Sequence, residues 1–158
     1  MVDKAIEGHR GAPFEMWIER GKVREFAHAV GAELPAHLTG ERPVIPPTFL
    51  TTLFFWEREV PGADIWPLVR MDPKRGMHAE QEYVFHGPPP RAGDKLVARS
   101  RIDRIYEKAG RRGGALTFVE LVTEFRDPEG RLVAEAKMTA VETGRAPGEP
   151  DPQEGPRP

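Results

Sequence analysis

Residues 46–57 read PPTFLTTLFFWE, and this stretch decides how the rest of the chain must fold. Apolar side chains fall on every side of any helix drawn through it, and a helix that is apolar all round needs protein all round it. Proline is favoured in the first helical turn, because its missing amide would have no partner there. Thr, Phe and Trp favour strands, so periodicity alone leaves a strand open. We predict a buried central helix over residues 48–56, since strand patterns able to wrap it follow.

Four strand patterns follow, over residues 79–86, 95–107, 115–126 and 132–143. The last three are joined by tight turns, so they must be antiparallel neighbours. Only one face of the resulting sheet is apolar, and the central helix is the obvious cover, which predicts an α+β fold with a curved antiparallel sheet around one helix. The side chains expected to face inward are Gln81, Tyr83, Phe85, Leu96, Ala98, Ile102, Tyr106, Val119, Leu121, Phe125, Leu132, Ala134, Ala136, Met138 and Ala140.

Upstream of the central stretch, the alternation of residues 14–19 predicts a short strand with one face buried. From Lys22 the apolar spacing becomes helical and ends at Gly31, while prolines and glycines in residues 34–44 predict a loop. On the strand 115–126, Leu116, Phe118 and Val122 are apolar on the otherwise charged face. An apolar patch on an outer face points to a partner, so we expect at least a dimer.

Composition narrows the class of protein. The chain has 158 residues, which fits one domain over residues 1–145 followed by a proline-rich tail, 146–158, that we expect to be disordered. A net charge of -2 gives no electrostatic footprint for nucleic acid. Apolar runs too short for a bilayer, and the lack of a signal peptide, predict a cytoplasmic protein without a membrane partner.

Residue usage limits the chemistry further. The absence of cysteine excludes disulfides, thiolate metal sites and a cysteine nucleophile. The sequence also has no asparagine and a single serine, together with 17 prolines, which suggests a heat-adapted source. His78, Glu80, Glu82 and His86 would share one strand face, but a solvated face is the simpler interpretation. The outermost two would also lie about 26 Å apart, so we expect no metal and no other cofactor.

The amino end of the central helix is a stronger candidate for a functional site than the four even-spaced residues. Free amides and a partial positive charge there suit a carbonyl oxygen that becomes negative during reaction, as in enolate formation from a thioester. Pro46 and Pro47 have no amide hydrogen, which leaves the amides of Thr48 and Phe49 as candidates. The alternative is that this end, like most helix ends, only binds water or a cap.

Several segments in order carry a resemblance: the helix from Lys22 to Gly31, the Ile-Pro-Pro-Thr-Phe of residues 45–49, the His-Ala-Glu-Gln-Glu-Tyr of 78–83, the turn ending in Gly93-Asp94, and residues 127–136. Together they resemble the MaoC-like dehydratases over roughly residues 14–144. The similarity is to their N-terminal, fatty-acid-synthase-type half, which also occurs as the accessory subunit of (3R)-hydroxyacyl-thioester dehydratases. The resemblance implies a hot-dog fold, in agreement with the architecture above.

This chain departs from the catalytic motif of the family that it resembles. Catalytically competent members carry Gly-Asp-x-Asn-Pro-x-His after the early helix, where this chain has Gly-Ala-Glu-Leu-Pro-Ala-His, ending at His37. Ala32 and Leu34 replace the Asp and the Asn, and Glu33, one residue off, would point elsewhere. Acid–base catalysis contributes about 10² to 10⁴ in rate, so a lone histidine cannot run the usual hydration.

The resemblance therefore implies a component of an (R)-specific enoyl-thioester hydratase or 3-hydroxyacyl-thioester dehydratase that takes its Asp/His pair from a partner. That partner would be a hot-dog subunit with the intact motif, in a homodimer or a heterodimer, and the substrate an acyl-CoA or acyl-carrier-protein thioester. His37 is the catalytic candidate, and Thr48, Phe49, His78 and Gln81 would surround the thioester.

Each of these assignments has a simpler alternative, and two other functions are possible. His37 can be a hydrogen-bonding loop residue, and Gln81 can satisfy the edge of the sheet. The chain can also be a non-catalytic acyl-thioester binding or scaffold protein. A hot-dog thioesterase is a third possibility, although Ile45–Phe49 offers no acidic residue at the helix start.

Overall fold

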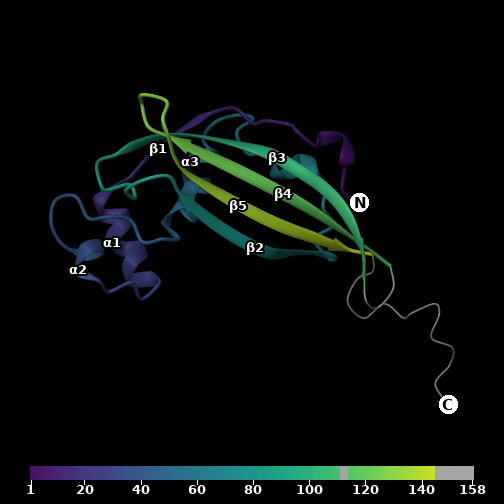
Figure 1. Ribbon diagram of the computed structural model, residues 1–158, viewed down its shortest axis with the longest axis horizontal. Helices are drawn as coiled ribbons and strands as arrows, with labels where there is room; N and C mark the ends of the chain where they lie inside the picture. Colours follow the sequence, from purple (N-terminus) through teal and green to yellow (C-terminus); the bar gives the residue numbers. More distant parts are fainter. Residues whose placement is uncertain (111–113, 145–158) are drawn as a thin grey trace, which may run out of the picture.

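The computed structural model describes residues 1–110 and 114–144 and contains one five-stranded antiparallel sheet in the order β1-β3-β4-β5-β2. The strands are β1 (Phe14–Trp17), β2 (Gly76–Phe85), β3 (Lys95–Ala109), β4 (Ala115–Arg126) and β5 (Leu132–Thr143). The helical segments are η1 (Lys4–Ile6), α1 (Arg20–Ala29), α2 (Pro35–Leu38), η2 (Phe49–Leu53), α3 (Phe54–Glu57) and η3 (Trp66–Val69). Figure 1 shows β2 to β5 as long neighbouring ribbons, with α1 and α2 gathered at one end of the sheet. The predicted α+β architecture is confirmed.

The central helix forms at the expected place, but it is less enclosed than expected. It begins as the 3₁₀ segment η2 and continues directly into α3. The η2 half is in the core, where Phe49 and Leu50 are fully buried. In the α3 half, Phe54 is 37% and Phe55 53% exposed. The expectation of burial on all sides is wrong there, because in the single chain the sheet covers only one side of this half.

Most inward-facing positions are as predicted, with two corrections caused by irregular pairing. The β4–β5 register shifts between Phe125 and Arg126, so Leu132 lies opposite the outward Arg126, and the prediction that Leu132 faces inward is wrong. The β3–β4 register shifts between Ile102 and Arg104, so Ile105 rather than Tyr106 lies opposite the buried Val119. An extra residue in one strand reverses the alternation beyond it. Tyr106 therefore faces outward, where its ring stacks on Phe118 with 5.1 Å between centroids. The prediction that Tyr106 faces inward is wrong for this reason.

The early elements match their patterns. Phe14, Met16 and Ile18 are buried along and just after β1. Helix α1 buries Val23 and Ala27, and Gly31 has φ +68° just after it. The expected loop contains the short helix α2, which Pro35 begins. The expected tail, 146–158, lies outside the described residues.

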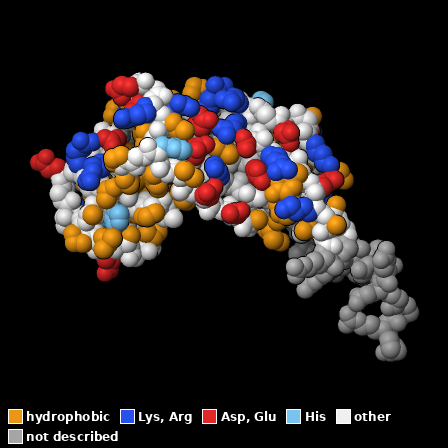
Figure 2. All heavy atoms as spheres, in the orientation of Figure 1, with side chains coloured by type: hydrophobic (Ala, Val, Ile, Leu, Met, Phe, Trp, Pro, Cys, Tyr) orange, Lys and Arg blue, Asp and Glu red, His pale blue; other side chains and the backbone are white. Residues whose placement is uncertain are grey.

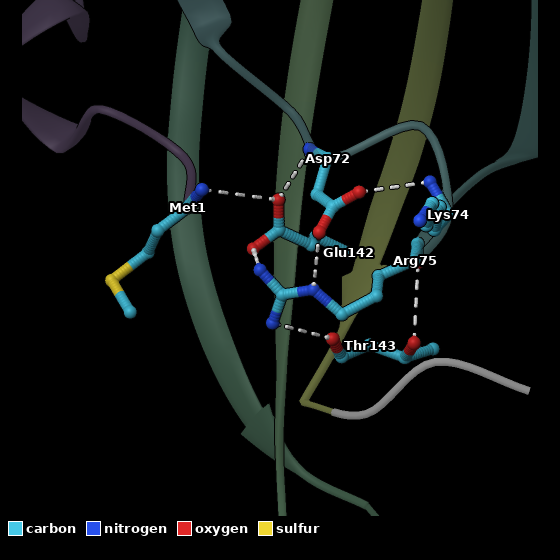
Figure 3. A network of polar contacts seen from close by, with 6 residues as sticks. All are labelled: Met1, Asp72, Lys74, Arg75, Glu142 and Thr143. Atoms are coloured by element: carbon cyan, nitrogen blue, oxygen red, sulfur yellow. Dashed lines mark hydrogen bonds and ion pairs between the residues drawn. The ribbon is translucent and has the colours of Figure 1, made fainter. Parts of the chain in front are cut away.

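A polar network ties the amino terminus to the far end of the sheet (Figure 3). Glu142, at the end of β5, is 4% exposed and accepts a hydrogen bond from the Asp72 amide at 2.8 Å. The Arg75 guanidinium donates to it at 3.2 Å, and the ammonium of Met1 lies 3.8 Å away. Arg75 also donates to the carboxylate of Asp72 at 2.9 Å. The network fixes the segment that leads into β2.

The outward face of the sheet is largely charged. Figure 2 shows acidic and basic side chains interspersed over the strands. On this outward face the carboxylate of Glu124 forms ion pairs with Arg101 at 2.6 Å and with Arg126 at 2.8 Å. The predicted apolar patch is partly covered by the chain itself. Val122 is 3% exposed, and the Lys108 ammonium lies 5.2 Å from the centroid of Phe118. Among the described residues, no helix is long and apolar enough to cross a membrane.

Candidate functional site

A cavity of about 220 Å³ lies between the central helical segment and the inward face of the sheet. Its apolar walls come from both sides, with Leu53 and Phe54 from the helical segment and Leu121, Ala136 and Met138 from the strands. Tyr83 of β2 also lines it and is hydrogen-bonded to the Thr51 side chain, which joins the sheet to the helical segment. The cavity is thus bounded by the elements that the sequence placed around the helix.

Two carboxyl groups, those of Glu57 and Asp64, interrupt these apolar walls. Glu57, at the end of α3, lines the cavity, and its Oε1 accepts a hydrogen bond from the Ser100 hydroxyl at 3.1 Å. Ser100 Oγ lies 2.8 Å from the hydroxyl of Thr123, which also lines the cavity. Because the single Ser100 proton goes to Glu57, the Thr123 hydroxyl must donate to Ser100. The three residues form one hydrogen-bonded chain, Thr123 to Ser100 to Glu57.

The environment of Glu57 disfavours its charge. The pKa of Glu57 is raised to about 7, mainly by burial and to a smaller extent by the nearby carboxylate of Asp64. The hydrogen bond from Ser100 and the charge of Arg58 act in the opposite direction but do not offset the burial. At neutral pH the carboxyl therefore exists in both forms and can donate or accept a hydrogen bond.

Sequence reasoning missed Glu57, because it stands at the end of an apolar stretch, just beyond the predicted helix. A signal was present all the same. The one serine of the chain, Ser100, falls at an inward position of β3 between Ala98 and Ile102, and it is fully buried. A buried hydroxyl needs a partner, which points to a polar group on the facing helix.

The structure places the predicted binding residues in different surroundings. Gln81 lines the cavity and donates from Nε2 to the Lys137 carbonyl at 3.2 Å, so it also satisfies the sheet. Thr48 is exposed immediately before η2, and its amide makes no hydrogen bond within the described chain. Phe49 is fully buried, and its amide donates to the Pro46 carbonyl at 2.9 Å. Of the two candidate amides, that of Thr48 is the one not already engaged.

His37 lies on α2 and is 8% exposed, with Nδ1 2.9 Å from the Val44 carbonyl oxygen. Because a carbonyl only accepts, Nδ1 carries the proton, and Nε2 of the neutral ring keeps its lone pair. His78 is exposed on β2 and lines a separate cavity of about 420 Å³ with Trp66 and Met71. Within the described chain no hydrogen bond or ion pair joins His37, Thr48 and His78.

The four even-spaced residues considered for a metal do not form one uninterrupted row. The register of β2 against β5 shifts between His78 and Glu80. His86 is instead paired with Glu135, with 2.9 Å between Nε2 and the carboxylate. Residues 1–110 and 114–144 contain no group of three or more acidic or histidine side chains that could hold a metal ion.

Known proteins resemble this chain over most of its length. A family model described as the FAS1-like dehydratase domain region matches residues 5–136. A UPF0336 protein of Saccharopolyspora erythraea is 30% identical over 154 residues, covering 92% of this chain and 94% of that protein. A UPF0336 protein of a Parafrankia species is 33% identical over 143 residues, covering 85% and 88%.

Solved structures agree in fold. The HadBC (3R-hydroxyacyl-ACP dehydratase) complex of Mycobacterium tuberculosis matches with a TM-score of 0.64 and 28% identity, over 85% of this chain and 96% of that chain. An (R)-hydratase of A. caviae has a TM-score of 0.56 and 20% identity, over 85% and 94%. The hot-dog fold implied by the sequence resemblance is confirmed.

Proposed function

Because the chain belongs to the FAS1-like dehydratase domain region family, we propose that it is a component of an (R)-specific enoyl-thioester hydratase or 3-hydroxyacyl-thioester dehydratase. The observation that carries the proposal is the largely apolar cavity along the central helical segment from Thr51 to Glu57. Thr51 lines this cavity one turn after Thr48. An acyl chain in the cavity would hold its thioester near the Thr48 amide.

The role of that amide follows from the reaction. Addition of water to an enoyl thioester, or its reversal, passes through a state in which the thioester carbonyl oxygen gains negative charge. A backbone amide fixed in position stabilises this charge without having to reorganise. The Thr48 amide is unengaged and precedes a helical segment, so it is the donor that we assign to the carbonyl.

The chain lacks a complete acid–base pair for the same step. The residues at the Asp and Asn positions of the competent motif are Ala32 and Leu34, and Leu34 is 64% exposed. His37 remains, with Nδ1 bonded to the Val44 carbonyl. We therefore assign delivery of water and protons to a partner chain that carries the intact motif, and to His37 at most a supporting role. The substrate is an acyl thioester of CoA or of a carrier protein.

The partner has a structural place to bind. Strand β2 is an edge of the sheet, ten residues long, and pairs with β5 on one side only. Residues 77–82 are all exposed, and Met77 is 53% exposed. A long exposed edge strand is a template for pairing with another chain. The similar HadBC structure is a complex, which supports assembly with a second hot-dog subunit.

The Thr48 amide can be removed without changing the neighbouring side chains. Thr48→Pro should lower the kcat for enoyl-CoA hydration by the assembled complex about 10²- to 10³-fold, as expected for the loss of one oxyanion donor. Thr48→Ala keeps the amide and is the matched control, with expected kcat near wild type. Equal activity of the two variants, both folded by circular dichroism, would show that this amide does not hold the carbonyl.

Two other functions make different predictions. A non-catalytic binding or scaffold protein would bind acyl-CoA saturably and give no turnover with any partner. A thioesterase would release free thiol from acyl-CoA. The hydratase component gives hydration turnover when a competent partner is present, and it releases no free thiol.

A further inference from the structure

The hydrogen-bonded chain of Thr123, Ser100 and Glu57 is incomplete toward the cavity. Oε1 of Glu57 accepts from Ser100, whereas Oε2 makes no hydrogen bond within the described chain. No buried side-chain nitrogen or oxygen there lacks a partner, so Oε2 must be accessible, and Glu57 lines the cavity. The unused oxygen is therefore available to something that enters the cavity.

A structural role alone explains this arrangement poorly. A carboxyl group among apolar side chains costs free energy unless it is fully hydrogen-bonded, and a leucine of similar size would suit the walls formed by Leu53 and Leu121 better. Both inner members, Ser100 and Thr123, are buried at 0% and 1% exposure, so the chain is anchored rigidly from the sheet side. A ligand in the cavity therefore needs to hydrogen-bond only to Glu57 Oε2, at the outer end of the hydrogen-bonded chain.

We propose that the cavity selects acyl groups that carry a neutral hydrogen-bonding substituent, a hydroxyl or an oxo group, which binds to Glu57 at the distal end of the acyl site. This inference rests on the proposed function and specifies its substrate class. With Glu57 protonated, its Oε2 donates to either substituent, and with Glu57 ionised it accepts from a hydroxyl. A plain alkyl chain would leave the carboxyl without a partner.

The length of the helical segment sets where the substituent belongs. Five 3₁₀ residues and four α-helical residues separate Thr48 from the end of α3, which corresponds to about 16 Å. A thioester held at Thr48 therefore reaches Glu57 with the far part of its chain. The substituent is expected away from the thioester, toward the end of a medium-length acyl group.

The test compares matched ligands on the full-length chain, alone and with a competent partner. Octanoyl-, decanoyl- and dodecanoyl-CoA are titrated by calorimetry beside their ω-hydroxy counterparts. The wild-type chain should bind the best-fitting ω-hydroxy ligand about tenfold more tightly than the unsubstituted ligand of equal length, the effect of about one hydrogen bond. Glu57→Leu should abolish this preference, and Glu57→Gln, which can still hydrogen-bond, should keep part of it.

Two further variants keep the test valid if Glu57→Leu fails to fold. Thr123→Val keeps the shape of the side chain, removes the first donor of the chain and should reduce the preference, and Glu59→Gln, on an exposed residue, should leave it unchanged. Equal or tighter binding of the unsubstituted ligand at every length overturns this inference and leaves the proposed function standing. Failure to bind any acyl-CoA, with or without a partner, overturns both.

Discussion

At the residue scale, the chemistry depends on which polar groups lack a hydrogen-bond partner within the described chain. The Thr48 amide and Glu57 Oε2 make no hydrogen bonds within the described chain, while the amide of Phe49 is engaged. Proline at positions 46 and 47 allowed the sequence to narrow the candidate amides to two, but not to choose between them. The choice depends on the Phe49–Pro46 hydrogen bond, which only the folded turn defines.

Glu57 gives a pH dependence that can be measured. Its pKa is raised from 4.5 to about 7, so the folded chain binds this proton more tightly than the unfolded chain between those values. The contribution of Glu57 to the free energy of unfolding therefore falls as the pH rises from about 4.5 to 7, and it stays lower above that range. Glu57→Gln should remove this pH-dependent change in the free energy of unfolding, which amounts to about 1–2 kcal/mol after a discount for the partial exposure of the side chain.

The measurement is urea unfolding at pH 5 and pH 8. Relative to wild type, the Gln variant should gain stability at pH 8 compared with pH 5, and Glu59→Gln, on the exposed surface, should show no such change. Parallel pH profiles for wild type and Glu57→Gln would mean that burial does not perturb this carboxyl.

At the element scale, the sequence predicted the strands well and the central helix only in part. Alternation depends on neighbouring residues, so it located β1 and the four longer strands. The bulge after Ile102 was missed because nothing in the local pattern marks it, and the misplaced face of Tyr106 followed. The exposure of Phe54 and Phe55 was missed because a sequence does not show how far a sheet extends around a helix.

The two halves of the central segment should differ in their contribution to stability. Phe49 is fully buried and packs edge-on against Phe26 with 5.4 Å between ring centroids, so Phe49→Ala should destabilise the chain by about 3–5 kcal/mol. Phe55 is 53% exposed, and Phe55→Ala should cost less than about 1 kcal/mol. Chemical denaturation of both variants measures the difference, and similar losses would contradict the division into a core half and a surface half.

At the scale of the whole molecule, the account requires a second chain. The sequence predicted a partner from the outward patch of Leu116, Phe118 and Val122, but this patch is partly covered by its own neighbours. The stronger structural reason is the open edge of β2. The sequence could not show it, because the order of strands in a sheet depends on long-range pairing rather than on local pattern.

The β2 edge can be blocked without breaking the sheet. Ala79 lies at the register shift and has no partner residue on β5, and proline is tolerated at such a bulge. Ala79→Pro should weaken self-association or partner binding at least about tenfold, because an edge proline opposes pairing with a further strand. Ala79→Ser is the control. Sedimentation velocity reads out the assembly, and an unchanged sedimentation profile for the proline variant would place the interface elsewhere.

The most direct test of the central claim is the steady-state hydration of a trans-2-enoyl-CoA, followed by loss of the enoyl absorbance, for this chain alone, for a hot-dog partner with the intact Gly-Asp-x-Asn-Pro-x-His motif alone, and for the two together. We predict negligible turnover by this chain alone and a kcat for the mixture at least about 10²-fold above it, lost when the Asp of the partner motif is replaced by Asn. Full activity of the isolated chain, unchanged by any partner, would contradict the account.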